Sequence, residues 1–259
     1  MKPALDGIPG PARTALQDEL LCIADSKLVL GNWFAECVMN GRSLPDFAAM
    51  LGMCTASYGQ TRAIYRYLDA LDHSYAHLER GRGADEIRSM NLLDEPPQNW
   101  QDFLVSIWLA EQATWSMASG FLRNRDRTIA GIARKIGEEA YFHLKWATGW
   151  FRIVEGARPD QDSFDEAMQR RYPVALRWFG PPDTLDQLDE AGLRDDPLSA
   201  IRSGFIAEVR DAAAPVGVDA DRLPLPRSFG GWRPDARRTG DLPAGLFEVI
   251  RFKDPELAR

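Results

Sequence analysis

The sequence predicts an all-α protein, folded as a large antiparallel bundle of long helices. Apolar residues recur at helical spacing in four segments, each roughly 25–30 residues long. No segment shows the alternating pattern of a β-strand, and neither a GxGxxG nor a GxxxxGK[ST] loop is present. A chain of 259 residues fits one large domain. We therefore expect a single domain over residues 14–259, with a core bundle at 14–156 and further helices and loops at 157–259.

The first half of the chain contains two of the predicted helices. Residues 1–13 hold three prolines and two glycines, which indicates an irregular arm. A broad apolar face from Thr14 to Val38 predicts the first helix. Ser43 is a typical N-cap for the second helix, because a proline and an aspartate follow it. We expect that helix to continue to about Arg80.

The remaining helices are expected after an extended, proline-containing segment at 92–97. Apolar periodicity predicts the third helix from Asn99 to about Arg123, and the fourth from Thr128 to Glu155 with Gly156 closing it. Shorter helices are expected at residues 164–179, 197–214 and 241–252. The glycine- and proline-rich stretch at 215–243 predicts loops packed on the bundle.

Composition narrows the function classes. The formal net charge of −7 argues against nucleic-acid binding. No apolar run reaches the ~18 residues that a membrane span needs, and the N-terminus lacks a signal-peptide pattern. The three cysteines lack a CxxC spacing, which favours reduced thiols over a disulfide frame or a zinc site. We therefore expect a cytoplasmic protein.

A long four-helix bundle raises the question of a di-metal carboxylate site. Such a site takes a carboxylate from two helices and a Glu-x-x-His pair from each of the other two. Neither Glu138 nor Glu139 stands three residues before His143. Between residues 47 and 68 the second helix has no Asp, Glu or His, and Gln60 is its nearest polar candidate. A neutral amide is a poor replacement for an anionic iron ligand.

These residues predict a depleted metal site in which a buried polar network replaces the metal. The expected members are Asp25, Gln60, Arg62, Glu111, Glu139 and His143. Buried carboxylates must be paired or hydrogen-bonded, so a nearby basic residue is expected to neutralise them. The candidates for that cation are Lys27, Arg62 and Lys145. A weak or single metal is the alternative interpretation.

Two other clusters have weaker functional interpretations. His73 and His77, with Asp69 and Asp72, have a spacing that suits a metal, but a solvated helix face is the favoured interpretation. The arginines at 233–238 could contact a phosphate-bearing ligand such as coenzyme A, although we favour a role in coating a loop or a partner surface.

Several short segments, in matching order and spacing, resemble the C-type subunit family of the phenylacetate-degradation epoxidase. LLDEPPQN at 92–99, followed by Asp102 and Phe103, is similar to the family's LLLVEQPNGDF. GQTR at 59–62 resembles its GQAR, WLAE at 108–111 its WQVE, and EAYFHL at 139–144 its EVRYHL. Ala56 departs from the family, which usually has an aspartate near that position. The resemblance runs from about Ala24 to Phe179.

The resemblance implies a ferritin-like fold and a supporting role. In that family the C-type subunit lacks a complete iron site and pairs with a homologous catalytic subunit. That catalytic subunit carries the di-iron centre and epoxidises the ring of phenylacetyl-CoA. We therefore expect a non-catalytic structural subunit without a cofactor of its own, for which a homodimer is one form that the isolated chain could take. Two alternatives remain: a stand-alone ferritin-like oxidase or oxygenase with an atypical metal site, and a homodimeric acyl-CoA-binding protein.

Overall fold

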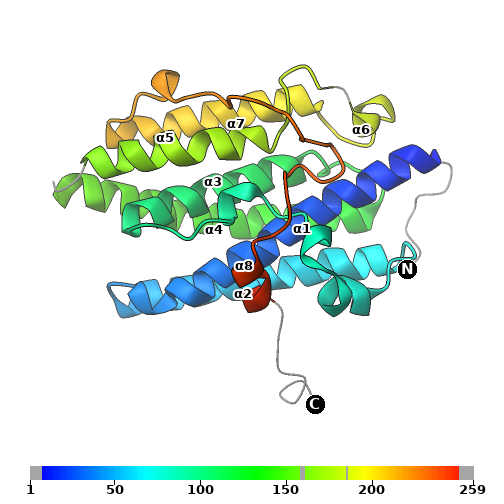
Figure 1. Cartoon of the computed structure of the whole chain (residues 1–259), viewed down its shortest axis with the longest axis horizontal. Helices are drawn as coiled ribbons and strands as arrows, with labels where there is room; N and C mark the ends of the chain where they lie inside the picture. Colours follow the sequence, from blue (N-terminus) through cyan, green and yellow to red (C-terminus); the bar gives the residue numbers. More distant parts are fainter. Residues whose placement is uncertain (1–7, 158–160, 185, 251–259) are drawn as a thin grey trace, which may run out of the picture.

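The computed structural model describes residues 8–157, 161–184 and 186–250. Within these ranges every regular element is helical, which confirms the predicted all-α, ferritin-like bundle (Figure 1). The α-helices are α1 (Gly10–Cys37), α2 (Leu44–Asp69), α3 (Trp100–Ser119), α4 (Arg127–Ala157), α5 (Gln161–Arg177), α6 (Gln187–Glu190), α7 (Leu198–Ala213) and α8 (Ala244–Ile250). Short 3₁₀ or π turns lie in the connections.

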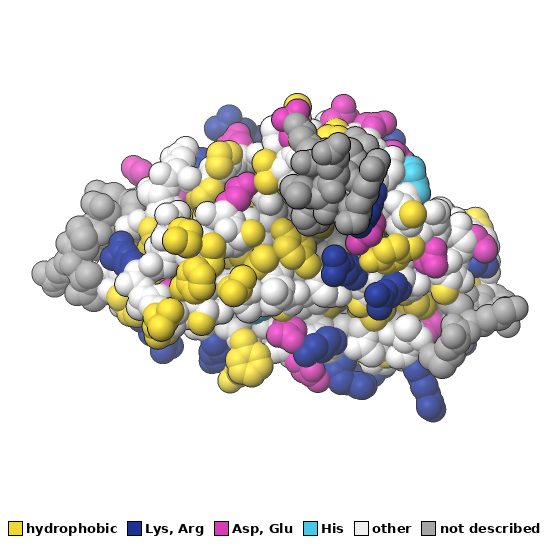
Figure 2. Space-filling model, turned by 90° about the horizontal axis from the view of Figure 1, so that it is seen from below, with side chains coloured by type: hydrophobic (Ala, Val, Ile, Leu, Met, Phe, Trp, Pro, Cys, Tyr) yellow, Lys and Arg dark blue, Asp and Glu magenta, His cyan; other side chains and the backbone are white. Residues whose placement is uncertain are grey.

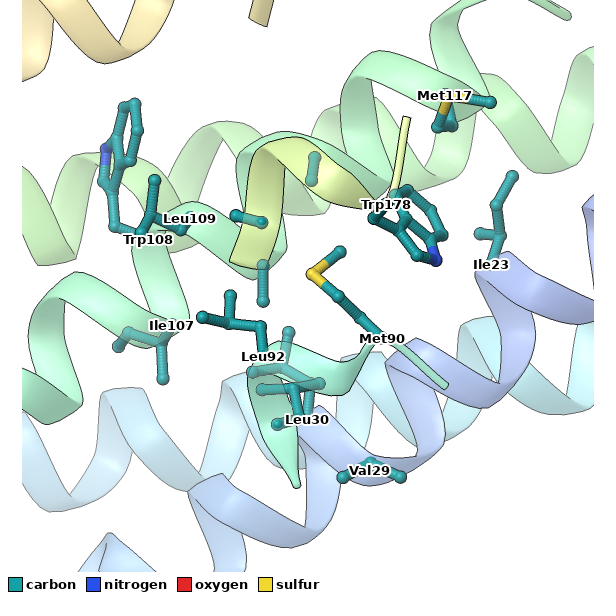
Figure 3. Packing of buried hydrophobic residues seen from close by; sticks show 14 of the residues in the cluster. Ile23, Val29, Leu30, Met90, Leu92, Ile107, Trp108, Leu109, Met117 and Trp178 are labelled. Carbon is teal, nitrogen blue, oxygen red and sulfur yellow. The ribbon is translucent and has the colours of Figure 1, made fainter. Parts of the chain in front are cut away.

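Helix α3 is the central helix of the bundle. It packs against α1, α4, α5 and α7, and every residue from Asp102 to Thr114 is buried. A helix that is covered on all sides needs apolar residues around its whole circumference, and α3 has them in Phe103, Ile107 and Trp108. Figure 3 shows Ile107, Trp108 and Leu109 among the packed apolar side chains of α1, α3 and the segment around Met90. Any polar residue on α3 must therefore find a partner inside the protein.

Helices α1 and α2 form a closely packed antiparallel pair. Ser43 caps α2 as the sequence predicts, because its hydroxyl accepts a hydrogen bond from the backbone N–H of Asp46 (3.3 Å). Gly31 on α1 allows the close approach: a Cβ at this position would lie 2.9 Å from the ring of Tyr58 on α2. The pair is long and rigid, and it sets the register between residues on the two helices.

Several boundaries differ from the sequence prediction. Helix α3 ends at Ser119 and not at about Arg123, and α4 continues through Gly156 to Ala157. Helix α1 begins at Gly10 and not at Thr14, because Pro11 lies in its first turn, where the missing N–H costs nothing. Residues 1–7 of the predicted arm lie outside the described residues. Helix α2 ends at Asp69, well before Arg80, because the chain turns at Asp72, whose φ is 74°.

The segment between α7 and α8 crosses the bundle as a strap. Figure 1 shows it running from α5 and α7 across α1 to α8. It is fastened by Arg237, which bonds Glu19 of α1, by Thr239, which bonds Asn91, and by Leu242, which bonds the carbonyl of Ala84. In the part of the chain that the structure describes, no helix is long and apolar enough to cross a membrane.

Gly180 makes a testable contribution to this packing. It follows α5 with a φ of 83°, and a Cβ there would lie 2.5 Å from the ring of Trp232. We expect Gly180→Ala to lower the free energy of unfolding by about 1–3 kcal/mol in chemical denaturation. Gly149→Ala is the control, since its Cβ would meet no atom within 4 Å inside α4. That variant should be neutral or up to about 1 kcal/mol more stable. Equal effects of the two substitutions would contradict the account.

Candidate functional site

A layer of polar side chains crosses the centre of the bundle. Lys27 of α1 and Glu111 of α3 are fully buried, and the Lys27 ammonium donates to Oε2 of Glu111. On the other side, Nδ1 of His143 from α4 lies 2.7 Å from Oε1 of Glu111. A carboxylate can only accept, so Nδ1 carries the proton of this bond. Both oxygens of Glu111 are thus occupied by groups from neighbouring helices.

These partners fix the charge on Glu111. Burial by itself would raise the pKa of this carboxyl, but the Lys27 ammonium and the His143 imidazole more than offset that effect and lower the pKa to about 2. Glu111 is therefore ionised in the folded protein at neutral pH. Because Glu111 is buried away from water, its negative charge is compensated by the Lys27 ammonium.

Helix α2 contributes Gln60 at the same level of the bundle. The register between the antiparallel helices is set by the Thr61 hydroxyl, which donates to the carbonyl of Ala24 (3.0 Å), and by Gly31, which lies against Tyr58. Gln60 therefore lies at about the same height along the helix pair as Lys27. Its side chain is buried, and neither end of its amide has a hydrogen-bond partner among the described residues. We define the central polar layer as Lys27, Gln60, Glu111 and His143, one residue from each helix.

Asp25 belongs to a separate cluster. Its carboxylate accepts two hydrogen bonds from Arg82 (2.7 and 2.8 Å), one from the Tyr65 hydroxyl (2.6 Å) and one from the backbone N–H of Arg88 (2.7 Å). All four interactions are directed to α2 or to the loop that follows it. Asp25 is therefore fully satisfied without any member of the central polar layer. Sequence periodicity could not predict Arg82 at this position, because a loop residue carries no periodic signal that would place it in the core.

Besides Asp25, two more predicted members of the network, Arg62 and Glu139, lie outside the central polar layer, which corrects the sequence prediction. Arg62 follows Gln60 by two residues and so faces away from it, exposed and paired with Glu79 (3.6 Å). Glu139 is only partly buried at the edge of α4, where it bonds Lys135 one turn earlier. Among the three candidate cations, Lys27 alone reaches a buried carboxylate, since Lys145 is exposed over the ring of Tyr141.

The central polar layer does not fit a dinuclear metal site. A protonated lysine offers no lone pair, and its ammonium lies against the carboxylate oxygen that would otherwise face a metal ion. Gln60 is neutral, so the layer contains a single carboxylate and a single imidazole. Within the described ranges, no group of three or more His, Cys, Asp or Glu side chains is placed to hold a metal ion.

The other sequence candidates are engaged in local structure. His77 lies on an exposed turn 3.2 Å from Glu86. Arg237 and Arg238 are buried and bond Glu19 (2.5 Å) and Asp94 (3.2 Å), so their guanidinium groups hold the strap in place. The cavity of about 600 Å³ beside Arg233 and Arg238 is lined mostly by polar and charged residues. It lacks the apolar character that an acyl chain needs.

The model of the family described as phenylacetic acid catabolic protein matches residues 3–229 of this chain. The chain belongs to the phenylacetic acid catabolic protein family. The C-type subunit of the 1,2-phenylacetyl-CoA epoxidase of Escherichia coli is 22% identical over 192 residues, which cover 73% of this chain and 77% of the relative.

Removal of the Lys27 ammonium should lower the free energy of unfolding of this protein by several kcal/mol. Lys27→Met leaves the buried Glu111 carboxylate without its cation, and we expect a loss of about 3–5 kcal/mol in the free energy of unfolding. Adding Glu111→Gln should restore most of that loss, because the pair then carries no charge. Lys145→Met, which removes an exposed lysine, should change stability by less than about 0.5 kcal/mol. A loss no larger for Lys27→Met than for Lys145→Met would contradict the role of the ion pair.

The lowered pKa of Glu111 also predicts a pH dependence. The pKa is near 4.5 in the unfolded chain and about 2 in the folded one, so the folded state binds fewer protons between these values. The stabilisation is complete above pH 4.5 and is lost as the pH falls towards 2. The stability advantage of the wild type over Glu111→Gln should therefore shrink across this window. An advantage that stays constant from pH 6 to pH 2.5 in urea titrations would show that the carboxyl is not held ionised.

Proposed function

We propose that this chain is the non-catalytic structural subunit of a multicomponent epoxidase that acts on the ring of an aromatic CoA thioester, with phenylacetyl-CoA as the expected substrate. Membership in the phenylacetic acid catabolic protein family supports the pathway. The relative that is named as a subunit of an epoxidase supports the subunit role. The observation that carries the proposal is the Lys27 ammonium on Glu111, because a cation supplied by the chain itself fills the place that a catalytic homologue would give to iron.

The di-iron centre of the complex belongs, in this proposal, to a homologous catalytic subunit. Metal ligands hold their geometry only when the helices that carry them are braced by surrounding structure. A bundle whose centre is fixed by an internal ion pair does not change shape with metal loading. This chain therefore provides a rigid surface against which the ligand-bearing helices of the partner can pack.

The surface offered to the partner is the α2–α4 face. Its exposed apolar residues are Met39 in the turn before α2, Leu44, Phe47 and Leu51 at the start of α2, and Phe142 and Ile153 on α4. The Tyr141 ring contacts Phe142 at the edge of this face, on the side toward α7. The Trp150 indole N–H donates to Asp46 (2.9 Å), which brings the end of α4 beside the start of α2 and joins the two groups. Figure 2 shows hydrophobic side chains gathered over one half of this side of the molecule.

The α2–α4 face suits a protein partner. Met39 is 79% exposed and Leu44 80%, and large exposed apolar side chains that gather on one surface are typical of a contact site for another protein. The exposed side of α2 carries no charged residue between Phe47 and Gly59, where it shows Ala48, Leu51, Gly52 and Thr55. Large apolar anchors among small, uncharged residues allow another helix to approach closely.

Reconstitution tests the role directly. The chain and a di-iron homologue from the same organism are purified separately, and epoxidation of phenylacetyl-CoA is measured for each alone and for the mixture. Every assay contains O2 and a reductant that supplies the two electrons needed to reduce the second oxygen atom to water. Turnover should require both, and this chain alone should be inactive. Full turnover by the homologue alone, or turnover by this chain alone, would refute the structural-subunit assignment.

The docking surface has its own test. Leu51→Glu places a charge in the α2–α4 face without disturbing the core, because Leu51 is 49% exposed. We expect at least a tenfold weaker association with the catalytic homologue in calorimetry and unchanged thermal stability of the chain alone. Leu225→Glu is the matched control, since Leu225 is 65% exposed and belongs to the strap between α7 and α8, not to the α2–α4 face. Equal losses for both variants would show that the face is not the contact.

A further inference from the structure

A cavity of about 300 Å³ lies away from the central polar layer, between α5, the segment around residues 91–95 and the strap. Its lining includes four arginines, Arg170, Arg171, Arg177 and Arg237, and two carboxylates, Asp94 and Glu95. A cavity of this size holds a group as large as a phosphate or pyrophosphate. None of these residues contributes to the α2–α4 face or to the central polar layer.

Two of the four guanidinium groups are fully engaged within the fold. Arg171 bonds both oxygens of Asp102 (2.7 and 2.8 Å) and the carbonyls of Leu92, Glu95 and Pro96. Arg237 bonds Glu19 and the carbonyl of Trp178. These two arginines build the wall of the cavity and keep its shape.

The other two guanidinium groups have N–H donors that can still bind a ligand. Arg170 reaches only Asp102 (3.0 Å), which Arg171 already neutralises, and its buried Nε has no hydrogen-bond partner among the described residues. Arg177 bonds the carbonyls of Ser228 and Gly230, and in the described part of the chain it has no carboxylate partner. Arg170 and Arg177 are two helical turns apart on α5 and therefore share one face.

The two carboxylates in the cavity wall do not neutralise the positive charge of Arg170 and Arg177. Asp94 is paired with Arg238 (3.2 Å), and Glu95 is exposed to solvent. Oδ1 of Asp94 is buried without a partner among the described residues, so it can accept a hydrogen bond from a hydroxyl group in the cavity. A ligand that satisfies all these groups brings several acceptor oxygens for the two arginines and one hydroxyl for Asp94. A protonated phosphate has this combination.

We propose that this cavity binds a phosphate group, with Arg170 and Arg177 as its ligands. Guanidinium groups bind phosphate oxygens through paired, charge-assisted hydrogen bonds, which is why arginine is common in such sites. The site is independent of the proposed function. The group it binds is either a free phosphate or pyrophosphate, or the phosphate end of a nucleotide-containing coenzyme.

Isothermal titration of the full chain with pyrophosphate and, separately, with coenzyme A tests the site. The wild type should bind at least one of the two probes, and Arg170→Gln/Arg177→Gln should bind it at least tenfold more weakly. Arg62→Gln/Arg66→Gln removes the same charge from the exposed side of α2 and should bind like the wild type. If coenzyme A binds more tightly than pyrophosphate, the phosphate belongs to a coenzyme. If the two probes bind equally tightly, it belongs to a free phosphate compound.

Two results would overturn the site. One is the absence of binding of both probes to the wild type at millimolar concentration. The other is an equal loss in the Arg62/Arg66 control, which would indicate non-specific attraction. Circular dichroism checks that the double variant is folded. If it is not, Arg170→Gln alone serves, because Asp102 keeps its bonds to Arg171 in that variant, and it should still weaken binding measurably.

Discussion

The ion pair between Lys27 and Glu111 is the interaction on which the centre of this bundle depends. Glu111 lies on α3, a helix covered on every side, so its carboxylate has no route to water. An uncompensated charge in that position would destabilise the folded state by more than most single interactions stabilise it. The Lys27 ammonium removes this cost. The exposed α2–α4 face is consistent with the supporting role that we propose for the chain.

The other buried charges follow a common pattern. Asp25 bonds Arg82, Asp102 bonds Arg171, and Glu19 bonds Arg237. In the first and third pairs a carboxylate on a long helix holds an arginine from a loop, and in the second Arg171 also holds the segment before α3 by its carbonyls. Charges therefore place the irregular segments on a bundle that apolar packing has already formed. The cavity beside α5 exists because two of these arginines form its wall.

The parts of the structure that follow from periodicity were predictable from the sequence. The long helices, the Ser43 cap and the inward position of Glu111 and His143 all follow from the spacing of apolar residues around them. Residues whose position depends on tertiary contacts were not. Glu139 stands one turn before the inward-facing His143, yet it bonds Lys135 near the surface. The outward position of Arg62, by contrast, follows from helical spacing, since it comes two residues after the buried Gln60. Arg82 reaches the core only because α2 stops at Asp69, and helical periodicity gave no sign of that stop.

Metal content tests the central claim most directly. The full chain is produced in cells supplied with iron, purified without chelators, and its iron per chain is measured by elemental analysis and by titration with Fe(II). An ammonium on Glu111 and a neutral amide on α2 predict no stoichiometric iron. Lys27→Glu, which turns the cation into a second carboxylate, is the informative companion variant and is expected to gain affinity for divalent metal. About two irons per wild-type chain would contradict the account.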